Sequence, residues 1–189
     1  ATINSGGMAF YIEGGASSNI ATELSSLVGS SGSGNKLNIT MNSGSNLIRW
    51  NAPTGGSINL SSISSLSSSI ANVTVTGSNY NTLSINKGEL VIDENVALTG
   101  TGNAYNGVDM SQSKVTLASG YNITGALDGQ IGIAQINPGT LSDVSITNNG
   151  TITLSGKKST VLALDHGYIT NTGTIEVTNP GITGEGSLG

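Results

Sequence analysis

The sequence predicts an all-β protein in which short strands stack in parallel as the successive coils of a β-solenoid. Three observations support this prediction. The heptapeptide ITNNGTI at 146–152 returns as ITNTGTI at 169–175, with six of seven positions identical and an offset of 23 (169 − 146 = 23). Apolar runs of strand length recur about every 8–12 residues between corners that contain Gly or Asn. The chain is rich in Gly, Ser, Thr and Asn, and only 4% of its residues are aromatic.

The composition favours a folded, patterned chain over a disordered one. Disordered chains combine low hydrophobicity with a high net charge, whereas this chain of 189 residues has a net charge of −5 and 35% hydrophobic residues. Its six basic residues are dispersed, so we expect no phosphate-binding stripe and no nucleic-acid partner. Cysteine is absent, which excludes disulfides and thiolate metal sites. No apolar run approaches the roughly 18 residues of a membrane-spanning helix, so we expect no transmembrane segment.

The segment 144–177 contains the clearest repeating unit. Its apolar residues alternate with polar ones, which is the pattern of strands with one face turned inward. Asn149 and Gly150 interrupt the first pair of strands, and we expect them to supply the positive φ of a tight turn. The stretch STVLALDHG at 159–167 predicts a third strand that closes the coil. The inward positions of the two copies are Val144, Ile146, Ile152, Leu154, Ile169, Ile175 and Val177.

Looser strand patterns cover the rest of the chain. GMAFYIEGG at 7–15 and KLNITM at 36–41 each place three apolar residues on one face. A β-sandwich would show a similar strand spacing, but the 23-residue self-similarity favours the solenoid. With coils of about 23 residues, the chain would make roughly eight turns. We expect residues 1–189 to form a single solenoid, and the patterned sequence at both ends indicates a fragment of a larger protein.

Two segments have helical rather than strand periodicity. In 17–34, apolar residues fall at helical spacings, with Ser18 or Asn19 available as an N-cap and Gly29 as a stop. In 59–71, apolar residues also fall near helical spacing, although Ser is a mediocre helix former. We interpret both segments as short helical excursions from a corner of the solenoid. They either cover apolar surface or protrude to bind a ligand.

The segment TNNGTITLSGKKSTVLALDHGYITNTGTIEV at 147–177 resembles the passenger repeats of autotransporters, especially those of the large fusobacterial outer-membrane adhesins. Those repeats contain a Ser-apolar-Gly-apolar strand, a Gly-rich corner and a strand pair around TNxGTI. GGMAFYIEGG at 6–15 is similar to their first strand. The resemblance implies a right-handed parallel β-helix, type V secretion, and display of a virulence adhesin on the bacterial outer-membrane surface, outside the cell. The absence of cysteine agrees with this family, whose passengers could not be secreted as cross-linked chains.

Residues suited to acid–base catalysis are poorly placed relative to their sequence neighbours. His166, the sole histidine, directly follows Asp165, and adjacent residues on a strand point to opposite faces, so we expect no Ser-His-Asp triad there. Asp93 and Glu94 would diverge for the same reason if they lie in a strand. GEGSLG at 184–189 spells a dinucleotide fingerprint, but no helix can follow it within this sequence, so we expect no nucleotide cofactor.

Stacked coils offer another route to a carboxylate cluster. A carbohydrate-active β-helix enzyme would need two carboxylates about 5–10 Å apart. Stacking could bring Asp143, Asp165 and Glu176 near one another, and the best pair is Asp143 and Asp165, at an offset of 22 (165 − 143 = 22). The sole arginine, Arg49, is remote from them in sequence. The nearest basic residues are Lys157 and Lys158. We therefore predict that the chain is not an enzyme, and we assign it no catalytic, cofactor-binding or metal-binding residue.

The aromatic residues leave two alternatives open. Trp50, the only tryptophan, either points outward as an interface anchor or is buried against Ile48 or Ile58. The tyrosines mostly adjoin Gly or Asn, so we expect them at corners. They are Tyr11, Tyr80, Tyr105, Tyr121 and Tyr168.

Taken with these features, the resemblance to autotransporter passengers implies a cell-surface adhesin fragment. It would bind host-cell or bacterial glycans or proteins through many weak contacts along a rigid surface. The alternatives are a carbohydrate-active β-helix enzyme and a structural spacer without a ligand. No ligand-binding residue is assigned. Unpaired strand edges at the two ends also predict end-to-end self-association.

Overall fold

The computed structural model describes residues 1–13, 37–51, 56–62, 71–76, 81–86, 88–98, 107–109, 114–135, 145–164 and 167–178. Within these residues the structure is almost wholly β, as the sequence predicts. The strands are β1 (Thr2–Ile3), β2 (Met8–Glu13), β3 (Leu37–Met41), β4 (Asn46–Asn51), β5 (Ser57–Asn59), β6 (Ala71–Val75), β7 (Asn81–Asn86), β8 (Glu89–Ile92), β9 (Val96–Leu98), β10 (Gly107–Asp109), β11 (Lys114–Leu117), β12 (Asn122–Gly125), β13 (Ile131–Gln135), β14 (Ser145–Asn148), β15 (Thr151–Leu154), β16 (Thr160–Leu164), β17 (Tyr168–Asn171) and β18 (Thr174–Val177).

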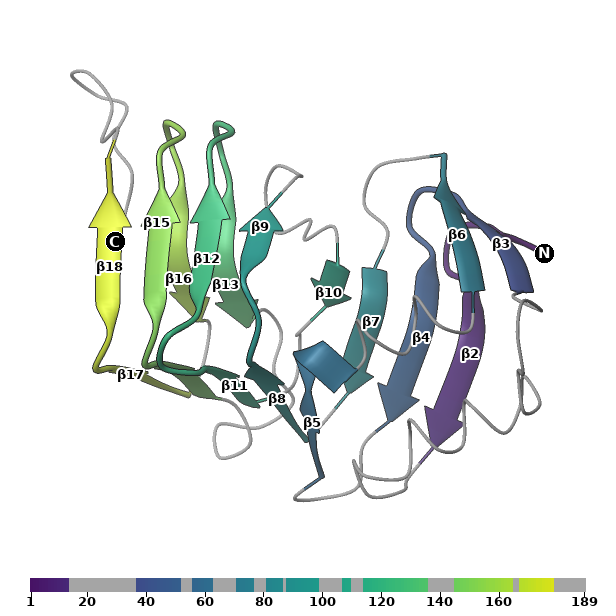
Figure 1. Ribbon diagram of the computed structural model, residues 1–189, viewed down its shortest axis with the longest axis horizontal. Coiled ribbons are helices and arrows are strands. Elements are labelled where there is room, and N and C mark those ends of the chain that lie inside the picture. Colours follow the sequence, from purple (N-terminus) through teal and green to yellow (C-terminus); the bar gives the residue numbers. More distant parts are fainter. Residues whose placement is uncertain are drawn as a thin grey trace.

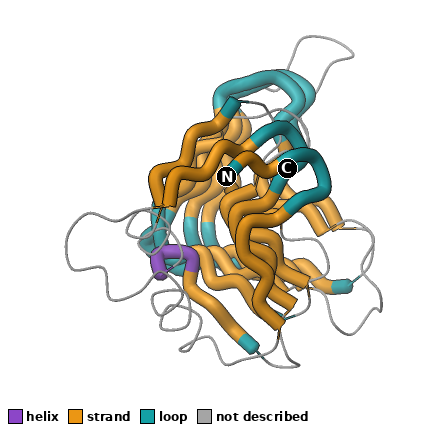
Figure 2. Tube along the Cα trace, turned by 90° about the vertical axis from the view of Figure 1, so that its right-hand side faces the viewer, coloured by secondary structure: helices purple, strands orange, loops and turns teal. Residues whose placement is uncertain are grey.

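The strand pairs of the described residues are all parallel, which excludes the antiparallel sandwich. Every pairing that begins at β3 or later joins strands three places apart in the chain, as in the five-stranded sheet β17-β14-β11-β8-β5. The other sheets are β10-β7-β4-β2, β18-β15-β12-β9, β1-β3-β6 and β13-β16. The strands advance along the long axis of the molecule from the N-terminal to the C-terminal end (Figure 1), and Figure 2 looks along that axis.

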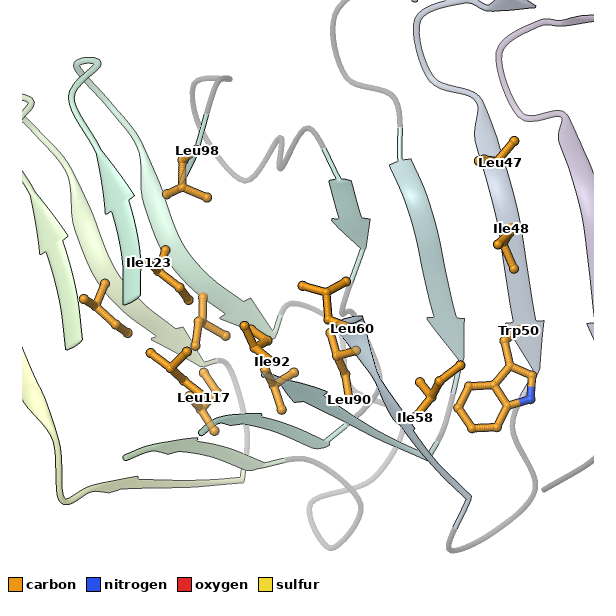
Figure 3. Close-up of a cluster of buried hydrophobic side chains, with 14 of the residues drawn as sticks. Leu47, Ile48, Trp50, Ile58, Leu60, Leu90, Ile92, Leu98, Leu117 and Ile123 are labelled. Atoms are coloured by element: carbon orange, nitrogen blue, oxygen red, sulfur yellow. The ribbon is translucent and has the colours of Figure 1, made fainter. Parts of the chain in front are cut away.

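The core is built from columns of inward apolar side chains in register. Ile58, Leu90, Val115 and Ile146 occupy equivalent positions in β5, β8, β11 and β14, and all four are buried. The residues that alternate with them, such as Lys114 and Thr116 in β11, are more exposed, so each strand has one inward face. β-branched residues suit such a narrow, pleated interior. Figure 3 shows part of this buried cluster, which runs through several strands.

The predicted 23-residue period holds for only part of the chain. The offset is 23 between β14 and β17, where Ser145 pairs with Tyr168 (168 − 145 = 23). It is 31 between β11 and β14, where Lys114 pairs with Ser145 (145 − 114 = 31). It is 38 between β2 and β4, where Met8 pairs with Asn46 (46 − 8 = 38). A uniform coil length, and the roughly eight turns that followed from it, are therefore wrong, because the segments that join the strands differ in length.

Gly150 has a different role from the one predicted. Positive φ occurs at other corner glycines, such as Gly120, but neither Asn149 nor Gly150 adopts it. A Cβ on Gly150 would instead overlap the backbone carbonyl oxygen of Tyr121, and one on Gly173 would overlap that of Gly150. Glycine is required because successive corners stack so closely that no side chain fits between them.

Only a small part of the two predicted helical excursions lies among the described residues. The segment 17–34 lies outside the described residues. In 59–71, the backbone is helical at 60–62, and residues 63–70 lie outside the described part. Both ends of the predicted stretch are strand residues, since Asn59 ends β5 and Ala71 begins β6. The described part of the segment therefore contains one helical turn that directly follows β5.

Candidate functional site

The structure resolves the two alternatives for Trp50. Its side chain is 0% exposed and lies in the same buried cluster as Ile48 and Ile58 (Figure 3). Alternation along β4 turns Ile48 and Trp50 inward and Arg49 outward. Trp50 is therefore a core residue, and its interpretation as an exposed interface anchor is wrong.

Of the three carboxylates that stacked coils could bring together, only Glu176 lies within the described residues. Asp143, Asp165 and His166 lie outside them. Glu176 is exposed on β18 and accepts a hydrogen bond from the Thr153 hydroxyl at 3.4 Å. Within the described part of the chain, no group of three His, Cys, Asp or Glu residues could hold a metal ion.

Asp93 lies at the corner after β8 rather than in a strand, and it has structural partners. Its Oδ1 accepts the backbone N–H of Ser61 at 2.9 Å, and its Oδ2 accepts the Ser61 hydroxyl at 2.7 Å and the Asn59 amide at 2.9 Å. Partial burial acts to raise the pKa of Asp93, but these hydrogen bonds outweigh it and lower the pKa below its usual value. The carboxylate thereby links the helical turn at 60–62, which follows β5, to the corner that follows β8, the strand paired with β5. We call each such level of the stack, from one strand to its partner three places along the chain, a circuit.

A second polar corner, between β12 and β13, is also structural. Gln130 is 1% exposed, and its side-chain oxygen accepts the backbone N–H of Leu127 at 2.9 Å. Its amide group donates to the Leu98 carbonyl at 3.1 Å, and Asp128 accepts the backbone N–H of Lys157 at 2.8 Å. The bonds to Leu98 and from Lys157 span 32 and 29 residues and connect successive levels of the stack, while the bond from Leu127 closes the corner itself. All three stabilise the stack, and none of them forms a catalytic centre.

The described tyrosines are exposed, but two of the three are not at corners. Tyr11 lies within β2 and is 51% exposed, and Tyr168 begins β17 and is 73% exposed. Tyr121 precedes β12 in a corner, as predicted. Tyr80 and Tyr105 lie outside the described residues. The corner prediction was wrong for Tyr11, which lies between the strand residues Phe10 and Ile12, and for Tyr168, which begins β17 directly after Gly167.

Within the described residues, the outer face of β2 and β4 brings together aromatic, acidic, basic and amide side chains. Tyr11 pairs in register with Arg49, and Glu13 pairs with Asn51. We call these four residues the Tyr11–Arg49 cluster. They face outward because the alternating residues of both strands, Ile12 and Trp50 among them, point into the core.

Hydrogen bonds hold three members of the Tyr11–Arg49 cluster in place. The Tyr11 hydroxyl donates to Glu13 Oε2 at 3.1 Å, and the Asn51 amide donates to Glu13 Oε1 at 3.1 Å. Arg49 is exposed, and its guanidinium makes no hydrogen bond or ion pair with a described residue. The cluster therefore combines an exposed aromatic ring, an oriented carboxylate and an accessible cation.

Sequence reasoning missed this cluster because its members are far apart in the chain. Tyr11 and Arg49 pair at an offset of 38 (49 − 11 = 38), and the register that joins them does not follow the 23-residue repeat. Alternation within MAFYIE and NLIRWN was the available signal, since it places Tyr11, Glu13 and Arg49 on outward faces. This alternation could not show that β2 and β4 are neighbours, with their outward residues on one surface.

Comparison with known proteins leaves the family open. No protein-family model, no curated protein and no solved structure significantly matches this chain. In the described residues, no helix combines the length and apolar character that crossing a bilayer would require.

Proposed function

We propose that this chain is a passenger fragment of a secreted autotransporter, folded as a right-handed parallel β-helix and displayed on the bacterial outer-membrane surface as an adhesin. One observation supports this proposal above the others: all the strand pairs of the described residues are parallel, and from β3 onward each strand pairs with a strand three places along the chain. The likeness of residues 144–177 to autotransporter passenger repeats supplies the cellular setting.

A stack of this kind suits adhesion for physical reasons. Its backbone hydrogen bonds run between successive circuits along the long axis, so the scaffold resists bending and keeps outward side chains at fixed spacings of about 4.8 Å. Outward polar residues repeat along the surface, as with Thr116, Thr147 and Thr170 in β11, β14 and β17. Repeated weak contacts along such a surface gain strength through multivalency.

Binding of the purified, fluorescently labelled chain to host epithelial cells and to neighbouring bacteria tests the proposal. We expect saturable binding that unlabelled chain displaces, and the effective competitor among free sugars and free arginine identifies the ligand class. The emission of Trp50, buried in the folded chain, reports that each preparation is folded. Absence of saturable binding by folded protein would overturn the adhesive role and leave a structural spacer.

A further inference from the structure

We propose that the Tyr11–Arg49 cluster binds a neutral pyranose ring, a sugar without a carboxylate, sulfate or phosphate group. This inference names a ligand class and a site for the proposed adhesin, and its cellular meaning rests on that proposed function. The binding event itself depends only on the side chains of Tyr11, Glu13, Arg49 and Asn51.

The aromatic ring supplies the apolar half of the site. One face of a pyranose presents several C–H groups and packs flat on an aromatic ring, whose amphipathic character also suits a wet surface. Half of the Tyr11 surface is accessible, at 51%, and its hydroxyl is anchored on Glu13. The ring is therefore held at a fixed orientation on a rigid strand rather than on a mobile loop.

The polar side chains supply both kinds of hydrogen-bonding partner that sugar hydroxyls need. A hydroxyl both donates and accepts, whereas a carboxylate only accepts and a guanidinium only donates. The oxygens of Glu13 each receive one bond from the cluster, which leaves further lone pairs for ligand hydroxyls. Arg49 pairs in register with Tyr11 on the adjacent strand, about 4.8 Å away. Its donors are not used by any described residue.

The charge of the cluster favours a neutral sugar over an acidic one. Glu13 and Arg49 carry opposite charges and lie diagonally across the two strands, so the site has no net charge. The Glu13 carboxylate would repel the carboxylate of an acidic sugar and offset its attraction to Arg49. The chain as a whole carries a net charge of −5, which also disfavours polyanions.

A second exposed tyrosine of the described strands, Tyr168, lacks this combination of neighbours. Tyr168 is more exposed than Tyr11, but its partner in register is Ser145. Tyr168 therefore provides a control of the same residue type on the same protein, and Lys114, an exposed cation on β11, provides a control for charge.

The test is direct binding of methyl pyranosides to the whole 189-residue chain, measured by saturation-transfer NMR and calorimetry. The panel contains neutral methyl hexosides and N-acetylhexosaminides alongside methyl glucuronide and methyl sialoside. We expect at least one neutral pyranoside to bind, with the acidic sugars weaker. Tyr11→Ala and Arg49→Gln should each weaken binding by about tenfold or more. In each variant the sugar loses its contacts with the removed side chain and meets only water at that position. Tyr168→Ala and Lys114→Gln should leave it unchanged.

Three results would overturn the inference: no neutral pyranoside binds, an acidic sugar or a peptide binds better at these residues, or the Tyr11 and Arg49 variants bind as the parent does. Cell binding distinguishes this failure from failure of the adhesin proposal. Cell binding that survives Arg49→Gln would place adhesion elsewhere on the chain, whereas pyranoside binding without cell binding would retain the site and remove the adhesive role. Trp50 emission confirms the fold of each variant, since Trp50 lies in β4 next to Arg49 and its side chain is buried on the inner face of that strand.

Discussion

Replacing Asn148 by aspartate should destabilise the fold severely although the two side chains have the same shape. Asn148 is 0% exposed at the end of β14. Its amide nitrogen donates to Asn171 Oδ1 at 2.7 Å and to the Thr174 carbonyl at 3.3 Å, and its Oδ1 accepts the backbone N–H of Gly150 at 3.2 Å. The amide thus connects two successive circuits through both donors while its oxygen closes the corner.

The substitution keeps the acceptor and removes both donors. In Asn148→Asp, the oxygens of Asn171 and Thr174 would face a carboxylate instead of an N–H group. Unsatisfied buried polar groups and an uncompensated buried charge together suggest a loss of about 3–5 kcal/mol in the free energy of unfolding. That is a large part of the roughly 5–15 kcal/mol typical of a whole domain. A buried carboxyl binds a proton more readily than a solvated one, so the deficit should shrink as the pH is lowered.

The neighbouring residue gives a matched control. Asn149 is partly exposed, and its Oδ1 accepts the Thr172 hydroxyl at 2.7 Å, a role that a carboxylate can keep. Urea unfolding followed by Trp50 fluorescence should show Asn149→Asp within about 1 kcal/mol of the parent chain and Asn148→Asp far below it. Equal unfolding midpoints for the two variants would refute the argument that the hydrogen bonds of the buried Asn148 amide hold successive circuits together.

Further predictions follow from single contacts. Gly150→Ala should cost about 1–3 kcal/mol through overlap with the corner before it, whereas Ser119→Ala, at that exposed corner, should change the free energy of unfolding by less than about 0.5 kcal/mol in urea titration. Because the pKa of Asp93 is lowered below 3.8 in the folded chain, its contribution is present above that pH and is lost as the pH falls through the lowered value. The stability gap between the parent and Asp93→Asn, of about 1 kcal/mol near neutral pH, should therefore close in acid. Trp50 is 0% exposed, so its emission should be blue-shifted, resist quenching by iodide and shift to the red on unfolding. Ile169, at an inward register position, is 46% exposed on the last sheet edge described, so light scattering should show concentration-dependent end-to-end association; a monodisperse monomer at high concentration would contradict this.

The regular part of the fold could be predicted because it depends on the local alternation of apolar and polar residues along each strand. Ile146, Ile152 and Leu154 are buried as the period-two pattern requires, and the third strand of the unit is found at Thr160–Leu164. The 23-residue offset between the two heptapeptides is also their pairing register. Local pattern and long-range pairing agree here because the corners of these two circuits have equal length.

Features that depend on pairing between unequal circuits could not be predicted. Asp93 has its partners 32 and 34 residues upstream, at Ser61 and Asn59, and no repeat marks that distance. The Tyr11–Arg49 cluster needs an offset of 38, the same offset that separates Glu13 from Asn51. In both cases the sequence shows which face a side chain occupies but not which residue of the neighbouring circuit lies beside it.

The recurring heptapeptide is explained by the corner that it builds. One inward column holds Ile92 at the end of β8, Leu117 at the end of β11, Asn148 at the end of β14 and Asn171 at the end of β17. The apolar members precede corners of three and four residues, at 93–95 and 118–121, whereas each asparagine precedes a corner of only two.

The chemistry of asparagine accounts for this difference. Isoleucine and leucine cannot bond to the backbone, but the Asn148 oxygen accepts the N–H of Gly150 two residues later and so closes the turn itself. Its amide then bonds the next asparagine of the column, Asn171, and Gly173 fits directly over Gly150 because neither has a Cβ. Asn and Gly therefore set the corner at its minimum length and repeat it in register. The Asn and Gly that the two heptapeptides share at 148 and 150 and at 171 and 173 have this one physical cause.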